Sequence, residues 1–175
     1  KSNTEMYIDG IKTEFNKIIN SDAFNITGNI RIEFKFKHKL TTTKDMFKNC
    51  KDIIEINIAN LKTENIIDSS HMFQNCTNLK SLNIGESFKK NSIRYMTSMF
   101  ESCENLDTIN LDHFNTSFVE DMESLFKGDK LLTSLNLKNF DTQKVKSMKA
   151  MLERCGQLTS LRLKNFDKEY SLLFL

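Results

Sequence analysis

The chain has 175 residues, enough for one domain with a buried core, and 39% hydrophobic with 27% charged residues is typical of a globular protein. Its net charge of +2 argues against a polyanionic partner, and no apolar run approaches the ~20 residues that a membrane-spanning helix needs. The chain has no proline and only five glycines, so we expect turns built from Asn, Asp, Ser and Thr.

Residues 1–37 are expected to form an N-terminal cap made of a helix and a strand. The apolar residues between positions 5 and 20 follow the spacing of one helical face. They are Ile8, Ile11, Phe15, Ile18 and Ile19. From Ile30 to Lys37 apolar and charged residues alternate, which indicates a half-buried strand. We predict that this strand is a degenerate first repeat and that the helix covers it.

Residues 38–167 contain five copies of one unit. Its clearest marker is an apolar pair with a small or polar residue three positions after the second member, as in Met99-Phe100-x-x-Cys103. The pairs begin at Met46, Met72, Met99, Leu125 and Met151, with steps of 26, 27, 26 and 26 residues. A segment of the type L-x-x-L-x-L and a closing apolar residue follow, as in Leu106 to Phe114. So regular a period indicates stacked units.

Each unit is expected to contribute one short helix and one strand. In the last copy the apolar residues are separated by steps of 3, 3, 1 and 3, the spacing of a helical face. These residues are Val145, Met148, Met151, Leu152 and Cys155. The L-x-x-L-x-L segments are expected to pair as parallel strands about 4.8 Å apart. Residues 168–175 are expected to start a further repeat or to form a C-terminal stub.

These units resemble leucine-rich repeats, and more narrowly the BspA-type repeats of surface proteins. The copy from Val145 to Phe166 carries the pattern most clearly, and the departures are minor. They are Leu125, Asp129, Leu152 and one inserted residue before Phe88. The resemblance implies an α/β fold, a curved leucine-rich-repeat solenoid with one short helix and one parallel strand in each unit. It also implies an adhesive or binding role outside the cell or at its surface, with no catalytic residues and no cofactor.

The cysteines fall at one position of the unit. Cys50, Cys76 and Cys103 are expected to form a ladder that Asp129 interrupts before Cys155. They are either small buried residues at the junction of helix and strand, or two neighbours among the first three form a disulfide. A linear ladder does not offer the tetrahedral convergence of ligands that zinc requires.

No constellation of catalytic residues is expected. His38, His71 and His113 occupy different positions of the unit and should not converge. The spacing implies no Ser/His/Asp set, no glycine-rich phosphate loop and no paired carboxylates, so we expect that the protein is not an enzyme.

The residues that alternate with the inward positions of the predicted strands form a polar outward face. Asn recurs at its central position in four consecutive units, beside Ser or Thr. The candidate binding residues are Ser81, Asn83, Thr108, Asn110, Asp112, Ser134, Asn136, Lys138, Ser160 and Arg162. In one interpretation the Asn side chains hydrogen-bond along the array and stabilise it. In the other the face docks a protein or, without aromatic residues for stacking, less readily a glycan.

Charge is banded along the array. Between Met99 and Phe126 there are seven acidic residues and no Lys or Arg, and the flanking regions are basic. The bands are either solvated surface or match a partner of complementary charge, such as a second copy of the chain. The acidic band would interrupt any basic stripe, so a nucleic acid partner is not expected. Asn25 and Asn115 are candidate glycosylation sites, whereas Asn75 lies beside Cys76 and is expected to be inaccessible.

We therefore expect a non-catalytic protein-interaction or adhesion module, displayed as an extracellular or cell-surface protein. Its partner is a protein, from a host or a second copy, and it contacts a membrane only through segments outside this chain. The alternative is a structural scaffold subunit within a larger multiprotein assembly.

Overall fold

The structure is a computed structural model that describes residues 4–8, 11–13, 32–36 and 39–166. The chain divides into two compact parts, residues 1–40 and 41–175. We call them the N-terminal part and the repeat part, and each is described by itself.

The N-terminal part contains three antiparallel strands, β1 (Thr4–Ile8), β2 (Ile11–Thr13) and β3 (Ile32–Phe36), in the order β2-β1-β3. The predicted helix is therefore wrong where β1 and β2 lie, and residues 14–20 are outside the described ones. Ile8 pairs with Ile11 in the antiparallel pair of β1 and β2. The strand predicted at residues 30–37 is present as β3, but it pairs with β1 in antiparallel fashion and is not a repeat unit.

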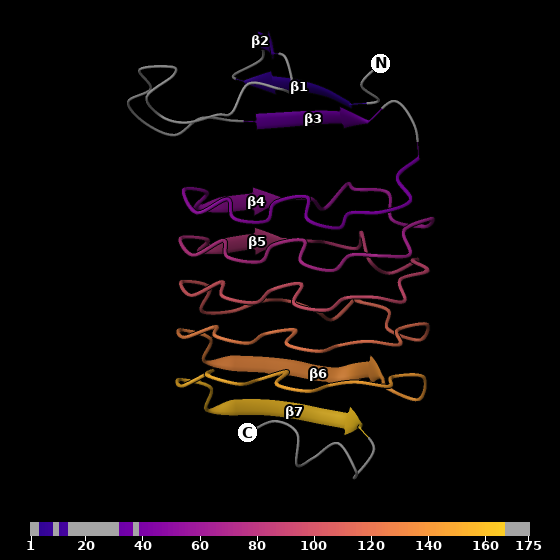
Figure 1. Cartoon of the computed structure of the whole chain (residues 1–175), viewed down its shortest axis with the longest axis vertical. Helices are drawn as coiled ribbons and strands as arrows, with labels where there is room; N and C mark the ends of the chain where they lie inside the picture. Colours follow the sequence, from indigo (N-terminus) through magenta and orange to yellow (C-terminus); the bar gives the residue numbers. More distant parts are fainter. Residues whose placement is uncertain (1–3, 9–10, 14–31, 37–38, 167–175) are drawn as a thin grey trace. The chain divides into compact units, whose positions relative to one another are not determined.

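The repeat part is a succession of five units that lie side by side (Figure 1). Equivalent residues near the start of each unit are joined by parallel bridges between neighbouring units: Thr42, Asp68, Tyr95, Asp121 and Ser147. Strand β4 (Glu55–Asn57) pairs in parallel with β5 (Ser81–Asn83), and β6 (Ser134–Asp141) pairs in parallel with β7 (Ser160–Asn165). The equivalent segment of the third unit, residues 106–111, is not a strand.

The predicted leucine-rich-repeat solenoid, with one helix and one strand in each unit, is wrong. The described residues contain no helix, and the parallel strands form two separate two-stranded sheets instead of one continuous sheet. The segments that we expected to be helical are runs of turns.

Backbone hydrogen bonds in these runs alternate between two kinds of partner. In the second unit the N–H of Phe73 donates to the carbonyl of Met99 in the next unit at 2.9 Å. The N–H of Gln74, one residue on, closes a turn onto the carbonyl of His71 at 3.1 Å. An α-helix would direct every N–H to the carbonyl four residues earlier. Half of the donors thus join neighbouring units, which is why no helix forms.

Two positions in every unit adopt the left-handed backbone conformation, with φ between 53° and 77°. They are Asp45, His71, Ser98, Ser124 and Ala150 at the first position, and Asn49, Asn75, Ser102, Gly128 and Arg154 at the second. Asn, Asp and Gly tolerate this conformation best among the residues. The two left-handed residues of each unit lie four positions apart, and each of them ends one turn and starts the next. The same steps of 3, 3, 1 and 3 therefore place apolar residues inward without a helix.

In the core of the repeat part, equivalent side chains of neighbouring units pack against one another. Phe47, Phe73, Phe100 and Phe126 form one stack, with ring centroids 5.3–5.6 Å apart and planes within 8°. A second series joins Phe88 to Phe114 at 4.7 Å and Phe114 to Phe140 at 6.1 Å. Each such side chain gains offset-stacking contacts in addition to its burial. The fixed repeat period is what places these rings over one another.

Phe100 lies between two rings of the first stack and is fully buried, so Phe100→Ala should lower the free energy of unfolding by about 3–5 kcal/mol. Phe118→Ala is the matched control, because Phe118 is 45% exposed and contacts Lys144 through a cation–π interaction worth about 0.5–1 kcal/mol. Urea unfolding measures both. Equal losses in the two variants would contradict the assigned core.

Candidate functional site

The outward face lies on the short strands of the repeat part. Asn136 is half-buried and the other nine candidate binding residues are exposed. Register brings some of them together: Ser134 lies opposite Ser160, and Asn136 opposite Arg162. Thr108, Asn110 and Asp112 lie in the third unit, which has no strand there. The face is therefore formed by β4–β5 and β6–β7 with an irregular segment between them.

The Asn residues of the face hold local turns and do not form a ladder along the array. The side-chain oxygens of Asn57, Asn83, Asn110 and Asn136 each accept the N–H two residues further on, at 2.9–3.4 Å. This is the Asx-turn geometry, which here follows the inward-facing segment. The interpretation that Asn side chains hydrogen-bond to one another along the face is thus wrong.

Hydrogen-bond donors on the face remain uncommitted. The side-chain amide of Asn136 donates to Asp112 at 3.1 Å, but those of Asn57, Asn83 and Asn110 have no partner among the described residues. The hydroxyls of Ser81, Ser134 and Ser160 have none in that part of the chain either. The face therefore offers free amide donors beside hydroxyl groups that can both donate and accept.

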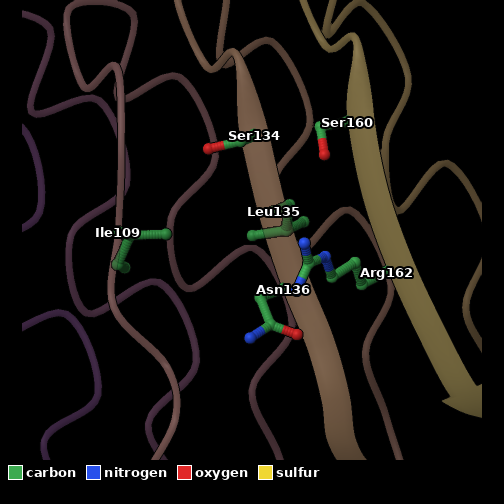
Figure 2. A pocket seen from close by; sticks show the side chains of 6 residues that line it. All are labelled: Ile109, Ser134, Leu135, Asn136, Ser160 and Arg162. Carbon is green, nitrogen blue, oxygen red and sulfur yellow. The ribbon is translucent and has the colours of Figure 1, made fainter.

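A shallow hollow of about 230 Å³ lies on this face between the third unit and the pair β6–β7 (Figure 2). Its lining residues are Ile109, Ser134, Leu135, Asn136, Ser160 and Arg162. Leu135 is buried and Ile109 half-buried, so the hollow has apolar contacts beside polar ones. Figure 2 shows the guanidinium of Arg162 reaching from β7 toward β6, between Leu135 and Asn136.

Two of the seven acidic residues of the band form ion pairs with basic residues of neighbouring units. Glu104 pairs with Lys130 at 2.9 Å, and Glu120 pairs with Lys146 at 2.7 Å and with Arg94 at 3.4 Å. The hydrogen bond from Lys146 lowers the pKa of Glu120 below its ordinary value. These pairs join neighbouring units, and the other five acidic residues of the band form no ion pair among the described residues.

The cysteines are all free thiols. Each of three donates to the carbonyl of a phenylalanine in the preceding unit: Cys76 to Phe47 at 3.1 Å, Cys103 to Phe73 at 3.4 Å and Cys155 to Phe126 at 3.0 Å. Burial raises the pKa of Cys76 and Cys155 to about 12 and that of Cys103 well above its ordinary value. Thiols with so high a pKa are poor nucleophiles and poor metal ligands.

Asp129 occupies the cysteine position of the fourth unit and is 1% exposed. Its Oδ1 accepts the backbone N–H of Cys103 at 2.8 Å, while its buried Oδ2 has no partner. Burial raises the pKa of Asp129 well above its ordinary range, and the nearby Glu101 and Glu104 add to the shift. When this carboxyl is protonated, it carries an O–H at the position where the other units carry an S–H.

Asp129→Cys should stabilise the protein, by an amount that grows with pH. The unfolded carboxyl loses its proton near pH 3.9, whereas the folded one retains it to a higher pH. Asp129 therefore costs nothing extra below the unfolded pKa, and its cost rises as pH increases toward the folded pKa.

Urea unfolding of both proteins under reducing conditions between about pH 4 and pH 8 measures this difference. Asp129→Asn is the control, since it removes the titration but keeps the shape. A stability difference that stays constant across this range would contradict the assignment.

The remaining candidate residues do not converge. His113 lies 3.9 Å from Glu86, the buried Nδ1 of His71 has no partner, and His38 is outside the described residues. Residues 39–166 and the described N-terminal strands contain no group of three or more side chains suited to a metal. Nor do they contain a helix long and apolar enough to cross a membrane.

The candidate glycosylation sites are placed in part. Asn115 is half-buried, and its side-chain oxygen accepts the N–H of Ser117 at 3.1 Å. Asn75 is also half-buried, and its amide donates to Asn49 at 2.9 Å. Asn25 lies outside the described residues.

Sequence reasoning missed the hollow and the role of the Asn column. The sequence did contain a signal for the role of the Asn column. Asn recurs just before the last inward residue of each L-x-x-L-x-L segment, where an Asx turn is expected. The hollow depends on the irregular third unit, whose L-x-x-L-x-L pattern is indistinguishable from the others.

Residues 41–166 match the family model described as "Mycoplasma protein of unknown function, DUF285". The match spans the repeat units and the greater part of the chain. Neither the curated proteins nor the solved structures contain a significant match.

Proposed function

The chain belongs to the DUF285 family, and we propose that it is a non-catalytic protein-interaction module displayed outside the cell or at its surface. The observation that carries the proposal is the set of uncommitted amide and hydroxyl groups on the outward face. Some polar side chains elsewhere join units, as Gln74 joins Glu101, whereas the amides of Asn57, Asn83 and Asn110 have no partner among the described residues. Exposed donors in a regular column suit a partner that brings backbone and side-chain oxygens, as a protein does.

A protein partner is favoured over a glycan. The candidate binding residues of the face include no aromatic side chain on which a sugar ring could stack. The non-catalytic assignment draws support from the buried thiols, whose raised pKa disfavours the nucleophilic thiolate. Display at the cell surface rests on the resemblance of the units to BspA-type repeats.

The alternative, a scaffold subunit in a larger assembly, is favoured by one observation. Leu161 and Leu163 of β7 are 37% and 39% exposed, although the equivalent residues of β6 are buried. A neighbouring subunit stacked on β7 would cover them.

Site-specific photo-crosslinking tests the proposal. A benzophenone amino acid replaces Ser81 or Ser134, whose hydroxyls hold no turn, in the chain displayed on intact cells. We expect a discrete protein adduct from both positions, which Thr108→Glu should reduce at least about tenfold, because the inserted carboxylate repels a partner that presents oxygen acceptors. Light scattering on the purified chain should show a monomer, and a stable oligomer built through β7 would support the scaffold alternative.

The matched control positions are Asn65 and Gln143, which are exposed and lie outside the face. Adducts that form equally from these positions, or that survive Thr108→Glu unchanged, would overturn the proposed interaction face.

A further inference from the structure

We propose that the hollow beside β6 and β7 binds the carboxylate of an acidic residue in an extended segment of a protein partner. Arg162 and the hydroxyls of Ser134 and Ser160 are its donors. The inference rests on the proposed function, since the hollow is part of the same face, and it adds the chemistry that the partner must present.

Strand register places the donors together. Ser134 and Ser160 are opposite residues of a parallel pair, and Asn136 and Arg162 are the next opposite pair on the same face. Adjacent strands lie about 4.8 Å apart and alternate residues about 6.6 Å apart along a strand. Register therefore places the two serines and Arg162 within one or two residue spacings of each other, and all three line the same hollow.

These donors have no partner within the described part of the chain, which distinguishes Arg162 from the other arginines there. Arg94 pairs with Glu120 at 3.4 Å, and Arg154 with Glu153 at 3.3 Å. Asn136 cannot serve the ligand in the same way. Its oxygen accepts from Lys138 and its amide donates to Asp112.

The charge around the hollow favours an anion. Arg162 occupies the position that Asn holds in the four preceding units, so it adds a positive charge at this point of the column alone. Lys138 and Lys164 lie two residues further along β6 and β7, are exposed, and form no ion pair among the described residues. Asp112, the nearby acidic residue of the third unit, already accepts from Asn136.

A carboxylate fits better than a larger anion. The hollow, at about 230 Å³, is below the usual 300–1,000 Å³ of sites for drug-sized ligands. The planar guanidinium matches the two oxygens of a carboxylate. Leu135 and Ile109 can pack against the methylene groups of an Asp or Glu side chain. A peptide also supplies carbonyl oxygens for the free amides of Asn83 and Asn110 in the units alongside.

The test uses an acetylated and amidated pentapeptide, Thr-Thr-Glu-Thr-Thr, titrated into the isotopically labelled full chain and followed by NMR. We expect shifts centred on the amides of Ser134, Leu135 and Arg162. The peptide with Gln in place of Glu and the variant Arg162→Gln should each weaken binding about tenfold. Arg162→Lys should recover part of the loss, because it keeps the charge but not the paired donors.

Arg94→Gln is the matched control, since it removes an exposed arginine outside the face and leaves Glu120 paired with Lys146. An equal loss in this variant, or equal binding of the Gln peptide, would overturn the carboxylate site. So would displacement of the peptide by inorganic phosphate at the same concentration, which would indicate a general anion site. If the peptide fails to bind the unaltered chain while the Ser81 photo-adduct still forms, this inference falls and the proposed function stands.

Discussion

The structure of the repeat part depends on one backbone hydrogen bond that recurs from unit to unit. Every second N–H in the turn runs is donated to a carbonyl 25 or 26 residues further along the chain, as from Phe47 to Met72 and from Phe73 to Met99. The remaining N–H groups close turns within their own unit, so both kinds of donor are satisfied without a helix. Because each residue lies over its equivalent, rings stack on rings and thiols meet carbonyls. The left-handed positions are the backbone requirement of this arrangement.

The repeat period and the inward positions could be predicted from the sequence, because a fixed step of 26 residues places equivalent side chains over one another. Burial of Met99, Phe100 and Leu111 and exposure of Thr108 and Asn110 agree with that pattern. The sequence could not distinguish a short helix from a run of turns in each unit. Both structures place apolar residues with this spacing on the side that faces the core. What separates them is the conformation of residues such as Asn75 and Ser102, and these residue types are equally common in helix caps. Nor could the split of the sheet at the third unit be predicted.

Polar groups of the repeat part fall into two sets with different consequences. Those at unit boundaries, such as Glu104 with Lys130 and Gln74 with Glu101, are consumed by the array. Those on the outward face are left over after the Asn oxygens have closed their turns, and they include free amides and hydroxyls. The proposed partner would supply acceptors to these amides, and Arg162 adds a positive charge at one end of the column. The buried carboxyl of Asp129 is the opposite case. It is a polar group in the interior, and only one of its two oxygens has a hydrogen-bond partner.

Through-hydrogen-bond NMR couplings between amide nitrogen and carbonyl carbon test the central claim most directly, because they identify the acceptor of each N–H. The alternating pattern predicts couplings from Phe73 to Met99 and from Phe126 to Met151, together with Gln74 to His71 within the second unit. A coupling from Phe73 to Ser69, four residues earlier, would indicate a helix and would contradict the account.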